Sequence, residues 1–482
     1  MKKIPLLIVL VAGCILALLI RLMLIPNPGF EADVAFWKSW SLAVVDFGIV
    51  KGLSLTNFNY PTPFGYFLGL LAKAYSVLAD PHDYTQFWMN NNLLFLFVSK
   101  LPAIIADFGI AGVILYIGKH AKKLGFPPIP YTLYAIFALL YLLNPVSLID
   151  GALWGQIDSV GVFLFLLALL FLLRRMSFIA GIIFMIAMMT KLQNMIYGPI
   201  FFLLVWQLTG LTGLARAAAG ALTGFAGTNI EFILTHNFGR VIESLTGNYD
   251  AFPWVSLNAF NPWWIYSGAA GMKVSDKILV LGLVNAKTLG LYLFSGAYLF
   301  AVLRQLTAKS EQIRFFLESF IVVNGAFFLF QTESHDRYAF PLIVMFLLWV
   351  PFYLNHESRI INYGKNKKFS LFIILYSLFS ILYFYNLHTA LVFNYPANGL
   401  PGLSALTAPW LTISVSFIFT GAFLWFLLWL ARDSYWSLIP PIALISLILI
   451  TKNLPLLTKQ PVYLNTLTPT EHKQDYGSRV IN

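Results

Sequence analysis

The segment 4–25, IPLLIVLVAGCILALLIRLMLI, decides the class of this protein. Its one charged residue is Arg21, and as a helix it is long enough to cross the ~30 Å hydrocarbon core of a bilayer. Similar apolar runs recur along the 482 residues, which are 59% hydrophobic and 11% charged. Soluble domains carry roughly 25% charged residues. The sequence therefore predicts an all-α polytopic membrane protein.

We expect about 13 transmembrane helices, because the chain contains that number of apolar runs of suitable length. Lys191 separates two shorter runs from each other. The predicted spans are residues 4–25, 91–118, 129–145, 158–173, 177–190, 195–208, 212–234, 280–303, 315–331, 338–354, 369–386, 409–431 and 436–452.

The segment 64–80 is also apolar, and the distribution of basic residues decides where it lies. If it rests on the outer surface, about half of the 31 Lys and Arg residues fall in short loops on the side of the N-terminus. Such loops face the cytoplasm, so the net charge of +11 reflects topology, and we expect no nucleic-acid partner. This predicts a multi-pass membrane protein with a cytoplasmic N-terminus and an external C-terminus. The uncleaved signal-anchor start fits a bacterial inner membrane, an archaeal plasma membrane or the endoplasmic reticulum, and the lack of a eukaryotic retrieval signal favours the plasma (inner) membrane of a prokaryote.

With this topology, residues 27–90 form a first external loop and residues 235–279 a second. Aromatic and aliphatic residues repeat at helical spacing from Phe36 to Phe47, which predicts an interfacial helix in the first loop. A proline-rich break then precedes a second interfacial helix at 64–80. Residues 1–454 form one transmembrane domain, and the polar tail 455–482 is placed outside.

Five segments carry polar or ionisable residues whose burial in the membrane would cost free energy, and all five fall on the external side. Ionisable groups in such positions usually face an aqueous cavity or a partner, so they are candidates for function. Their shared side predicts a single external site. The segments are Asp33, Asp150–Asp158, Thr190–Asn194, Ser256–Trp264 and Glu333–Tyr338.

The residue types in these segments suit a lipid-phosphate donor better than a nucleotide-linked one. A carboxylate at a cavity edge can act as a general base for a hydroxyl group. Lys and Arg can hold a phosphate, and Trp and Tyr present apolar faces that suit a sugar ring. The sequence contains neither a Gly-rich phosphate loop nor paired aspartates in D-x-D spacing, so it does not support a nucleotide-sugar site.

These motifs, in this order, resemble those of the GT-C class of glycosyltransferases, which use polyprenyl-phosphate sugars. The chain is most similar to prokaryotic mannosyltransferase-like members related to the second GPI mannosyltransferase, and more distantly to dolichyl-phosphate-glucose glucosyltransferases. The resemblance covers residues 1–350. The matching positions are Asp33 with Trp40, Tyr60–Tyr66, Trp154-Gly-Gln156-Ile-Asp158-Ser159, Lys191 with Gln193, Asn258 with Asn261 and Trp263, and His335-Asp336-Arg337-Tyr338, where the family has Glu in place of Asp336.

The resemblance implies a GT-C fold in which residues 1–454 are the catalytic domain. Asp33 would be the catalytic base, and Arg337, His335 and Lys191 would bind the donor phosphate. The reaction would transfer a sugar, mannose by similarity, to a glycan, lipid or protein acceptor on the outer face. It would invert the configuration at the anomeric carbon. No metal or other cofactor is implied. The sugar and acceptor pocket would comprise Trp40, Tyr60, Trp154, Gln156, Asp158, Gln193, Asn258, Asn261, Trp263 and Asp336.

Other interpretations of these residues remain open. Asp33 and Asp158 can each cap a helix, and Lys191 and Arg337 can anchor span ends at the interface. Arg21 lies near a span end, so we expect its side chain to extend along the helix to the membrane interface (snorkelling). Lys100, Asp107 and Lys287 lie within predicted spans, where we expect internal charge pairs. The alternative functions are transfer of glucose, aminoarabinose or a uronic sugar, and transport or lipid flipping, which would predict charges near mid-membrane.

Overall fold

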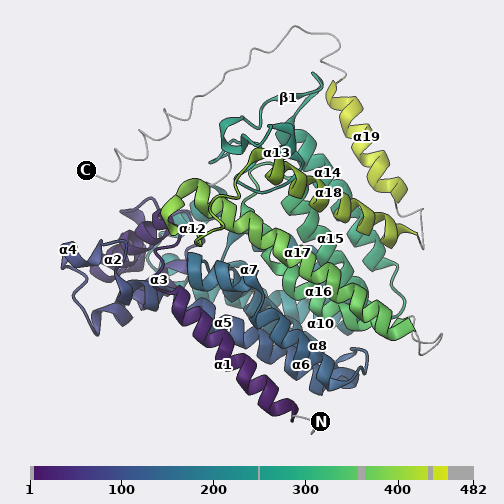
Figure 1. Ribbon diagram of the computed structural model, residues 1–482, viewed down its shortest axis with the longest axis horizontal. Helices are drawn as coiled ribbons and strands as arrows, with labels where there is room; N and C mark the ends of the chain where they lie inside the picture. Colours follow the sequence, from purple (N-terminus) through teal and green to yellow (C-terminus); the bar gives the residue numbers. More distant parts are fainter. Residues whose placement is uncertain (1–4, 248–249, 357–363, 433–437, 454–482) are drawn as a thin grey trace. The chain divides into compact units, whose positions relative to one another are not determined.

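The computed structural model describes residues 5–247, 250–356, 364–432 and 438–453. Nearly all ordered elements in these ranges are helices, which confirms the all-α prediction (Figure 1). The chain divides into two units that we describe separately. The first comprises Met1–Tyr249, Ala308–Phe320 and Phe340–Ser404, and the second comprises Asp250–Thr307, Ile321–Ala339 and Ala405–Asn482.

The first unit holds the N-terminal helices, the first predicted external loop and two later helices. Short 3-10 or π-helical turns lie at Ala121–Leu124, Leu148–Trp154, Leu192–Tyr197 and Pro396–Asn398. The α-helices are α1 (Leu6–Leu24), α2 (Glu31–Ser54), α3 (Phe64–Ser76), α4 (Tyr84–Phe87), α5 (Leu93–Lys119), α6 (Tyr131–Leu142), α7 (Pro145–Ser147), α8 (Asp158–Leu173), α9 (Ser177–Met188), α10 (Gly198–Thr228), α11 (Ile230–Leu234), α12 (Phe238–Thr246), α16 (Phe340–His356) and α17 (Gly364–Asn394).

The second unit contains the second predicted external loop and the helices around it. Helix α15 (Gln312–Phe330) begins in the first unit and ends in the second. The loop carries an antiparallel pair of two-residue strands, β1 (Leu279–Val280) and β2 (Val284–Asn285). The other elements are α13 (Pro262–Tyr266), the 3-10 turns Gly271–Lys273 and Asp336–Ala339, α14 (Ala286–Leu306), α18 (Pro409–Ala431) and α19 (Ile439–Asn453).

Eight helices in the described part of the chain are long and apolar enough to cross a membrane, judged by length and composition. The bent pair Tyr131–Leu142 and Pro145–Trp154 would make a ninth span. Three further apolar helices are shorter, at Asp158–Leu173, Ser177–Met188 and Ile439–Ile448. Helix α3, in the segment predicted to rest outside the membrane, has 13 residues and is not among the candidate spans. The protein is thus a polytopic membrane protein.

Helix α10 reverses direction at Gly210. The backbone there has φ 68° and ψ −171°, a region open to glycine almost alone. Before the reversal α10 runs antiparallel to α9, because Phe201 stacks on Phe184 and Thr209 lies 3.4 Å from Ser177. After it α10 runs parallel to α9, because Gly220 packs on Phe178 and Gly224 on Ile182. The two halves correspond to the two predicted runs 195–208 and 212–234.

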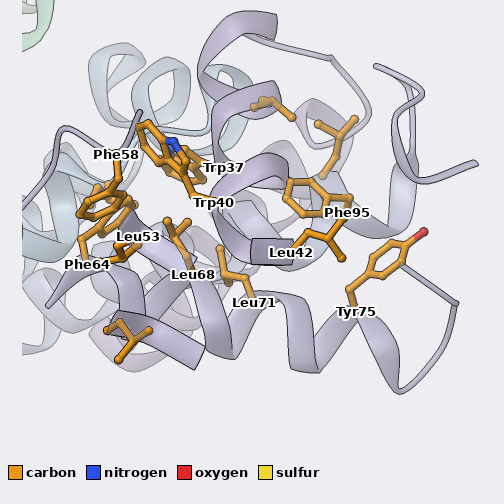
Figure 2. Packing of buried hydrophobic residues seen from close by; sticks show 14 of the residues in the cluster. Trp37, Trp40, Leu42, Leu53, Phe58, Phe64, Leu68, Leu71, Tyr75 and Phe95 are labelled. Atoms are coloured by element: carbon orange, nitrogen blue, oxygen red, sulfur yellow. The ribbon is translucent and has the colours of Figure 1, made fainter. Parts of the chain in front are cut away.

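Helix α2 makes a similar reversal at Gly48, where φ is 75° and ψ is 166°. The chain returns so closely that a Cβ at Gly52 would lie 2.4 Å from the carbonyl oxygen of Ala43. The folded-back helix packs on α3 and the start of α5 around one hydrophobic core. Figure 2 shows the residues of this core, which include Trp37, Trp40, Leu42, Leu53, Phe58, Phe64, Leu68, Leu71, Tyr75 and Phe95.

A buried ion pair joins α1 to α5. The Arg21 guanidinium lies 3.0 Å from the carboxylate of Asp107, and both side chains are fully buried. Arg21 also donates to the Leu142 carbonyl at 2.7 Å, and Tyr141 donates to Asp107 at 2.6 Å. The expectation that Arg21 snorkels to the interface is therefore wrong. Asp107 does belong to an internal charge pair, as predicted, and Arg21 is its cation.

Substitution of Gly210 by alanine should destabilise the protein by about 1–3 kcal/mol, because a Cβ disfavours this backbone conformation. A Cβ would meet no atom within 4 Å there, so the cost is conformational and not a clash. The measurement is thermal unfolding in detergent. Gly227→Ala is the matched control, because Gly227 lies within α10 and also has open space around it. Equal melting temperatures for the two variants would contradict the strain.

Arg21→Met should cost about 3–5 kcal/mol, because it leaves the Asp107 carboxylate buried without its cation. The double substitution Arg21→Met with Asp107→Asn should cost less than the sum of the two single substitutions. Denaturant unfolding in detergent measures all three. Arg216→Met, at an exposed arginine of α10, is the control and should stay within about 0.5 kcal/mol of wild type. If the cost of the double substitution equals the sum of the two single costs, the Arg21–Asp107 pair contributes no coupling energy to stability.

Candidate functional site

The carboxylate of Asp33 and the side-chain amide of Gln156 meet in the first unit. Asp33 lies half-buried in the first turn of α2, and Gln156 is fully buried in the turn before α8. The Gln156 amide nitrogen donates to Asp33 Oδ2 across 123 residues of sequence. Gly155, with φ 91°, ends the π-helical turn Leu148–Trp154 and permits the bend that places Gln156 there.

Lys191 fixes the orientation of this amide. The Lys191 side chain is 5% exposed, and its ammonium lies 2.9 Å from Gln156 Oε1 and 2.7 Å from Asp158 Oδ2. An ammonium only donates hydrogen bonds and a carboxylate only accepts them. The oxygen of Gln156 must therefore face Lys191 and its nitrogen must face Asp33. The orientation follows from the hydrogen-bond network.

Asp158 neutralises Lys191 and begins α8. Its second oxygen lies 3.5 Å from the Gln193 amide nitrogen. A buried ion pair of this kind is retained only when further hydrogen bonds satisfy it, and Gln156 and Gln193 supply them here. Five residues predicted to form the site are thus connected in one network: Asp33, Gln156, Asp158, Lys191 and Gln193.

The predicted role of Lys191 in binding a phosphate stays a prediction, and its observed contacts give the ammonium another task. Asp158 already balances its charge at 2.7 Å, and the side chain is buried. The contacts favour a role in orienting Gln156 rather than direct capture of an anion.

The segment that leads into α2 is held by Lys100, from within α5. Its buried ammonium donates to three backbone carbonyls, those of Ile25 at 3.0 Å, Asn27 at 2.6 Å and Leu153 at 2.8 Å. Gly29, with φ 66°, passes so close to the same turn that a Cβ would lie 2.4 Å from the Trp154 carbonyl oxygen. Lys100 therefore ties the residues before Asp33 to the residues before Gln156, instead of pairing with Asp107.

Three aromatic residues predicted for the sugar pocket are packed into the protein. Trp40 is 2% exposed in the core shown in Figure 2, and its indole nitrogen donates to Asn57 at 3.0 Å. Trp154 is buried and stacks on Phe30 with ring centroids 5.3 Å apart. Tyr60 is half-buried and stacks on Phe64 at 4.5 Å.

In the second unit, the segments around Asn258 and His335 pair with each other. The Leu257 amide donates to the Ser334 carbonyl at 2.9 Å, and Asn258 and His335 form an antiparallel bridge. Asn258 has φ 63°, which is unusual for a residue other than glycine. The next residues form the turn Asp336–Ala339, in which Asp336 is buried and Arg337 is partly buried, with its guanidinium 3.9 Å from Asp336.

Asn261 and Trp263 anchor this loop through buried hydrogen bonds. The side-chain oxygen of Asn261 caps α13 by accepting from the Trp264 amide at 3.0 Å, and Asn261 is fully buried. The indole nitrogen of Trp263 donates to the Phe330 carbonyl at the end of α15, at 2.7 Å. These contacts anchor α13, so both side chains shape the loop through its packing.

A cluster of three carboxylates also lies in the second unit. Oxygens of Asp250, Asp276 and Glu333 lie within 4.8 Å of one another, a spacing that could hold a metal ion. The ammonium of Lys287 already lies among them, 2.7 Å from Asp250, 2.6 Å from Glu333 and 3.8 Å from Asp276. Lys287 thus takes part in internal ion pairs, as the sequence favoured. It links the loop before α14 to residue 333.

Several residues of the site region were missed by the sequence interpretation. Glu31, two positions before Asp33, accepts from Asn90 at 2.6 Å and from Asn398 at 3.0 Å. The signal for Glu31 was available, because Glu31 and Asp33 form an acidic pair at the start of a predicted helix. Asn90 and Asn398 carried none, because single asparagines in loops are common and neither belongs to a motif.

No family model matches the chain, and no curated protein sequence matches it significantly.

Two neighbouring acids, Asp276 and Asp250, should affect the pH dependence of the free energy of unfolding in opposite directions. Burial raises the pKa of Asp276 to about 6, with Glu333 and Asp250 adding to the rise and Lys287 opposing it. The folded protein then holds an extra proton, and stability falls as pH rises from about 4 to about 6. A hydrogen bond from Lys287 lowers the pKa of Asp250, which instead contributes stability above its ordinary pKa.

At pH 7.5, Asp276→Asn should therefore raise the melting temperature and remove the loss of stability between pH 4 and 6. Asp250→Asn should lower the melting temperature at the same pH. Thermal unfolding of both variants in detergent, at pH 5 and 7.5, is the measurement. A destabilised Asp276→Asn protein at pH 7.5 would show that its carboxylate is charged and well compensated.

Proposed function

We propose that this protein is a membrane-embedded inverting glycosyltransferase. It transfers a sugar, mannose by the resemblance of its motifs, from a polyprenyl-phosphate donor to an acceptor hydroxyl on the outer face of the plasma membrane. The observation that carries this proposal is the network from Asp33 through Gln156 to Lys191 and Asp158. It joins three separate motifs of the resemblance, at 33, 154–159 and 191–193.

In the proposed reaction Asp33 is the general base. The acceptor hydroxyl attacks the anomeric carbon, its proton passes to Asp33, and the bond from that carbon to the phosphate oxygen breaks, so polyprenyl phosphate leaves with the bonding electrons. Gln156 orients the carboxylate by donating to Oδ2. Half-burial leaves Asp33 partly accessible, as a base that meets a substrate requires.

The leaving phosphate gains negative charge in the transition state, so cationic donors near it would stabilise that state most. We propose Arg337 and His335 for this role. Arg337 offers several donors to a phosphate, and its turn is held in place by the bridge between Asn258 and His335. Asp336 stands where the family has Glu, and its proposed role is to hold the Arg337 side chain, 3.9 Å away.

We further propose 13 membrane crossings, with the N-terminus inside and the active site outside. The long candidate helices, the bent pair and the shorter apolar helices give twelve crossings, and the reversal at Gly210 supports a thirteenth. Helices α2 and α3 would rest in the outer interface. Exposed apolar side chains on and after α3 support this, namely Leu70, Val77 and Leu78.

A different lipid-linked sugar would use the same base and the same leaving group, so this alternative differs only in the sugar pocket. Transport or lipid flipping has less support. The charges buried in α1 and α5 already have partners, since Arg21 pairs with Asp107 and Lys100 binds three carbonyls.

Asp33→Asn should lower sugar transfer about 10²- to 10⁴-fold, the usual contribution of a general base. The assay uses purified protein in nanodiscs, radiolabelled mannosyl-phosphoundecaprenol and an extract of host lipids and glycans as acceptor. Asp80→Asn is the matched control, because Asp80 lies in the same external loop with a side chain that is 69% exposed. It should transfer at the wild-type rate.

Undiminished transfer by Asp33→Asn would refute the base assignment. If the wild-type protein transfers no mannose, donors carrying glucose, aminoarabinose or a uronic sugar test the alternative within the same mechanism. Mass spectrometry of host glycans and glycolipids, with and without the gene, identifies the acceptor.

A further inference from the structure

The first turn of α2, which carries Asp33, is held by residues from a distant part of the chain. Phe30, just before the helix, has no side-chain oxygen to cap the exposed amides of the first turn. The Ala32 amide instead donates to the hydroxyl of Tyr395 at 3.0 Å. Tyr395 follows α17 and lies 363 residues further along the chain.

Asn398 holds the same segment through three further hydrogen bonds. Its side-chain nitrogen donates to the Gly29 carbonyl at 2.8 Å and to the Glu31 carboxylate at 3.0 Å. Its own carbonyl accepts from the side chain of Asn27 at 2.9 Å. Asn398 is 5% exposed, so these bonds form where water competes little.

An aromatic contact joins the two sides of the segment. The Phe30 ring lies edge-on to Tyr395, with centroids 4.9 Å apart, and stacks on Trp154 at 5.3 Å. Trp154 is two residues before Gln156. The chain around residue 30 is therefore held between the turn that supplies Gln156 and the segment after α17.

Helix α17 is itself fixed to the start of that turn. Asn144 donates to Tyr376 at 3.1 Å and to Ser380 at 2.8 Å, and both partners lie on α17. The residues that follow Asn144 run through α7 and the π-helical turn to Gln156. Helix α17 and the segment that follows it thus contact the chain on both sides of the hydrogen bond between Asp33 and Gln156.

We propose that Tyr395 and Asn398 are positioning residues that aim the Asp33 carboxylate at Gln156. We call this pair, with its bonds to residues 27–32, the α2 clasp. The proposal rests on the proposed function, because it assigns the clasp a task in the reaction of Asp33. It also gives a task to the segment after α17, which lies beyond the part of the chain that resembles known glycosyltransferases.

The test compares full-length Tyr395→Phe and Asn398→Ala proteins in nanodiscs. Tyr395→Phe removes one oxygen and keeps the ring against Phe30, so the fold should persist. Asn394→Ala is the matched control, because the Asn394 side chain bonds to Ala390 of its own helix at 2.8 Å. Amide hydrogen exchange over residues 27–37 and transfer from mannosyl-phosphoundecaprenol are measured for each protein.

Both variants should exchange about 2- to 10-fold faster over residues 27–37, as expected for the loss of one hydrogen bond or a few. Their kcat should fall about 10- to 100-fold with KM changed less than about twofold, since a misplaced base slows the chemical step. The acid limb of the pH–rate profile should move to higher pH, because a weaker bond from Gln156 favours protonated Asp33. Lower amounts of folded protein would not move that limb.

Two failures are distinguishable. A wild-type protein that transfers no sugar from any of the lipid-linked donors, carrying mannose, glucose, aminoarabinose or a uronic sugar, overturns the proposed function. A wild-type protein that transfers mannose while both variants match its kcat, or unchanged exchange over residues 27–37, overturns the clasp. Asn394→Ala behaving like Asn398→Ala would also overturn it.

Discussion

The candidate site depends on one side-chain amide held between a cation and an anion. A glutamine amide can be rotated at little cost in water, but Gln156 is fully buried between Lys191 and Asp33. Because lysine only donates and a carboxylate only accepts, reversal of the amide would lose both hydrogen bonds at once. The cost of burying Lys191 is offset by Asp158, so the position of Asp33 depends, through Gln156, on the ion pair between Lys191 and Asp158.

Other buried charges of the first unit hold the backbone on both sides of the contact between Asp33 and Gln156. Lys100 uses its ammonium to bind three carbonyls, which brings the residues before α2 against the turn before Gln156. Arg21 and Asp107 join α1 to α5 by a buried ion pair. Each group is costly to bury, and each has its hydrogen bonds satisfied. Together they fix the backbone segments whose side chains then meet at Gln156.

Sequence reasoning succeeded where a motif names its residues, and failed where position depends on packing. Asp33, Gln156 and Lys191 lie in motifs on one predicted side of the membrane, and they meet in the structure. The predicted place of Trp40 in a sugar pocket gave no indication that its ring is buried in the hydrophobic core of the first loop. Arg21 was misjudged because its partner, 86 residues away, depends on how α1 and α5 pack. Tyr395 and Asn398 could not be found, because only the folded chain brings them to residue 30.

In the second unit, the candidate residues lie on a strained backbone that side-chain ion pairs stabilise. Asp250, Asn258 and Glu333 all adopt positive φ, which costs of order 1 kcal/mol or more for residues with a Cβ. Two of them, Asp250 and Glu333, bind the ammonium of Lys287, and Asn258 bridges His335. Strain of this kind persists only where surrounding contacts overcome it. The Lys287 cluster supplies such contacts immediately before the turn that carries Arg337, so the proposed phosphate ligand rests on a loop whose conformation is set by charge.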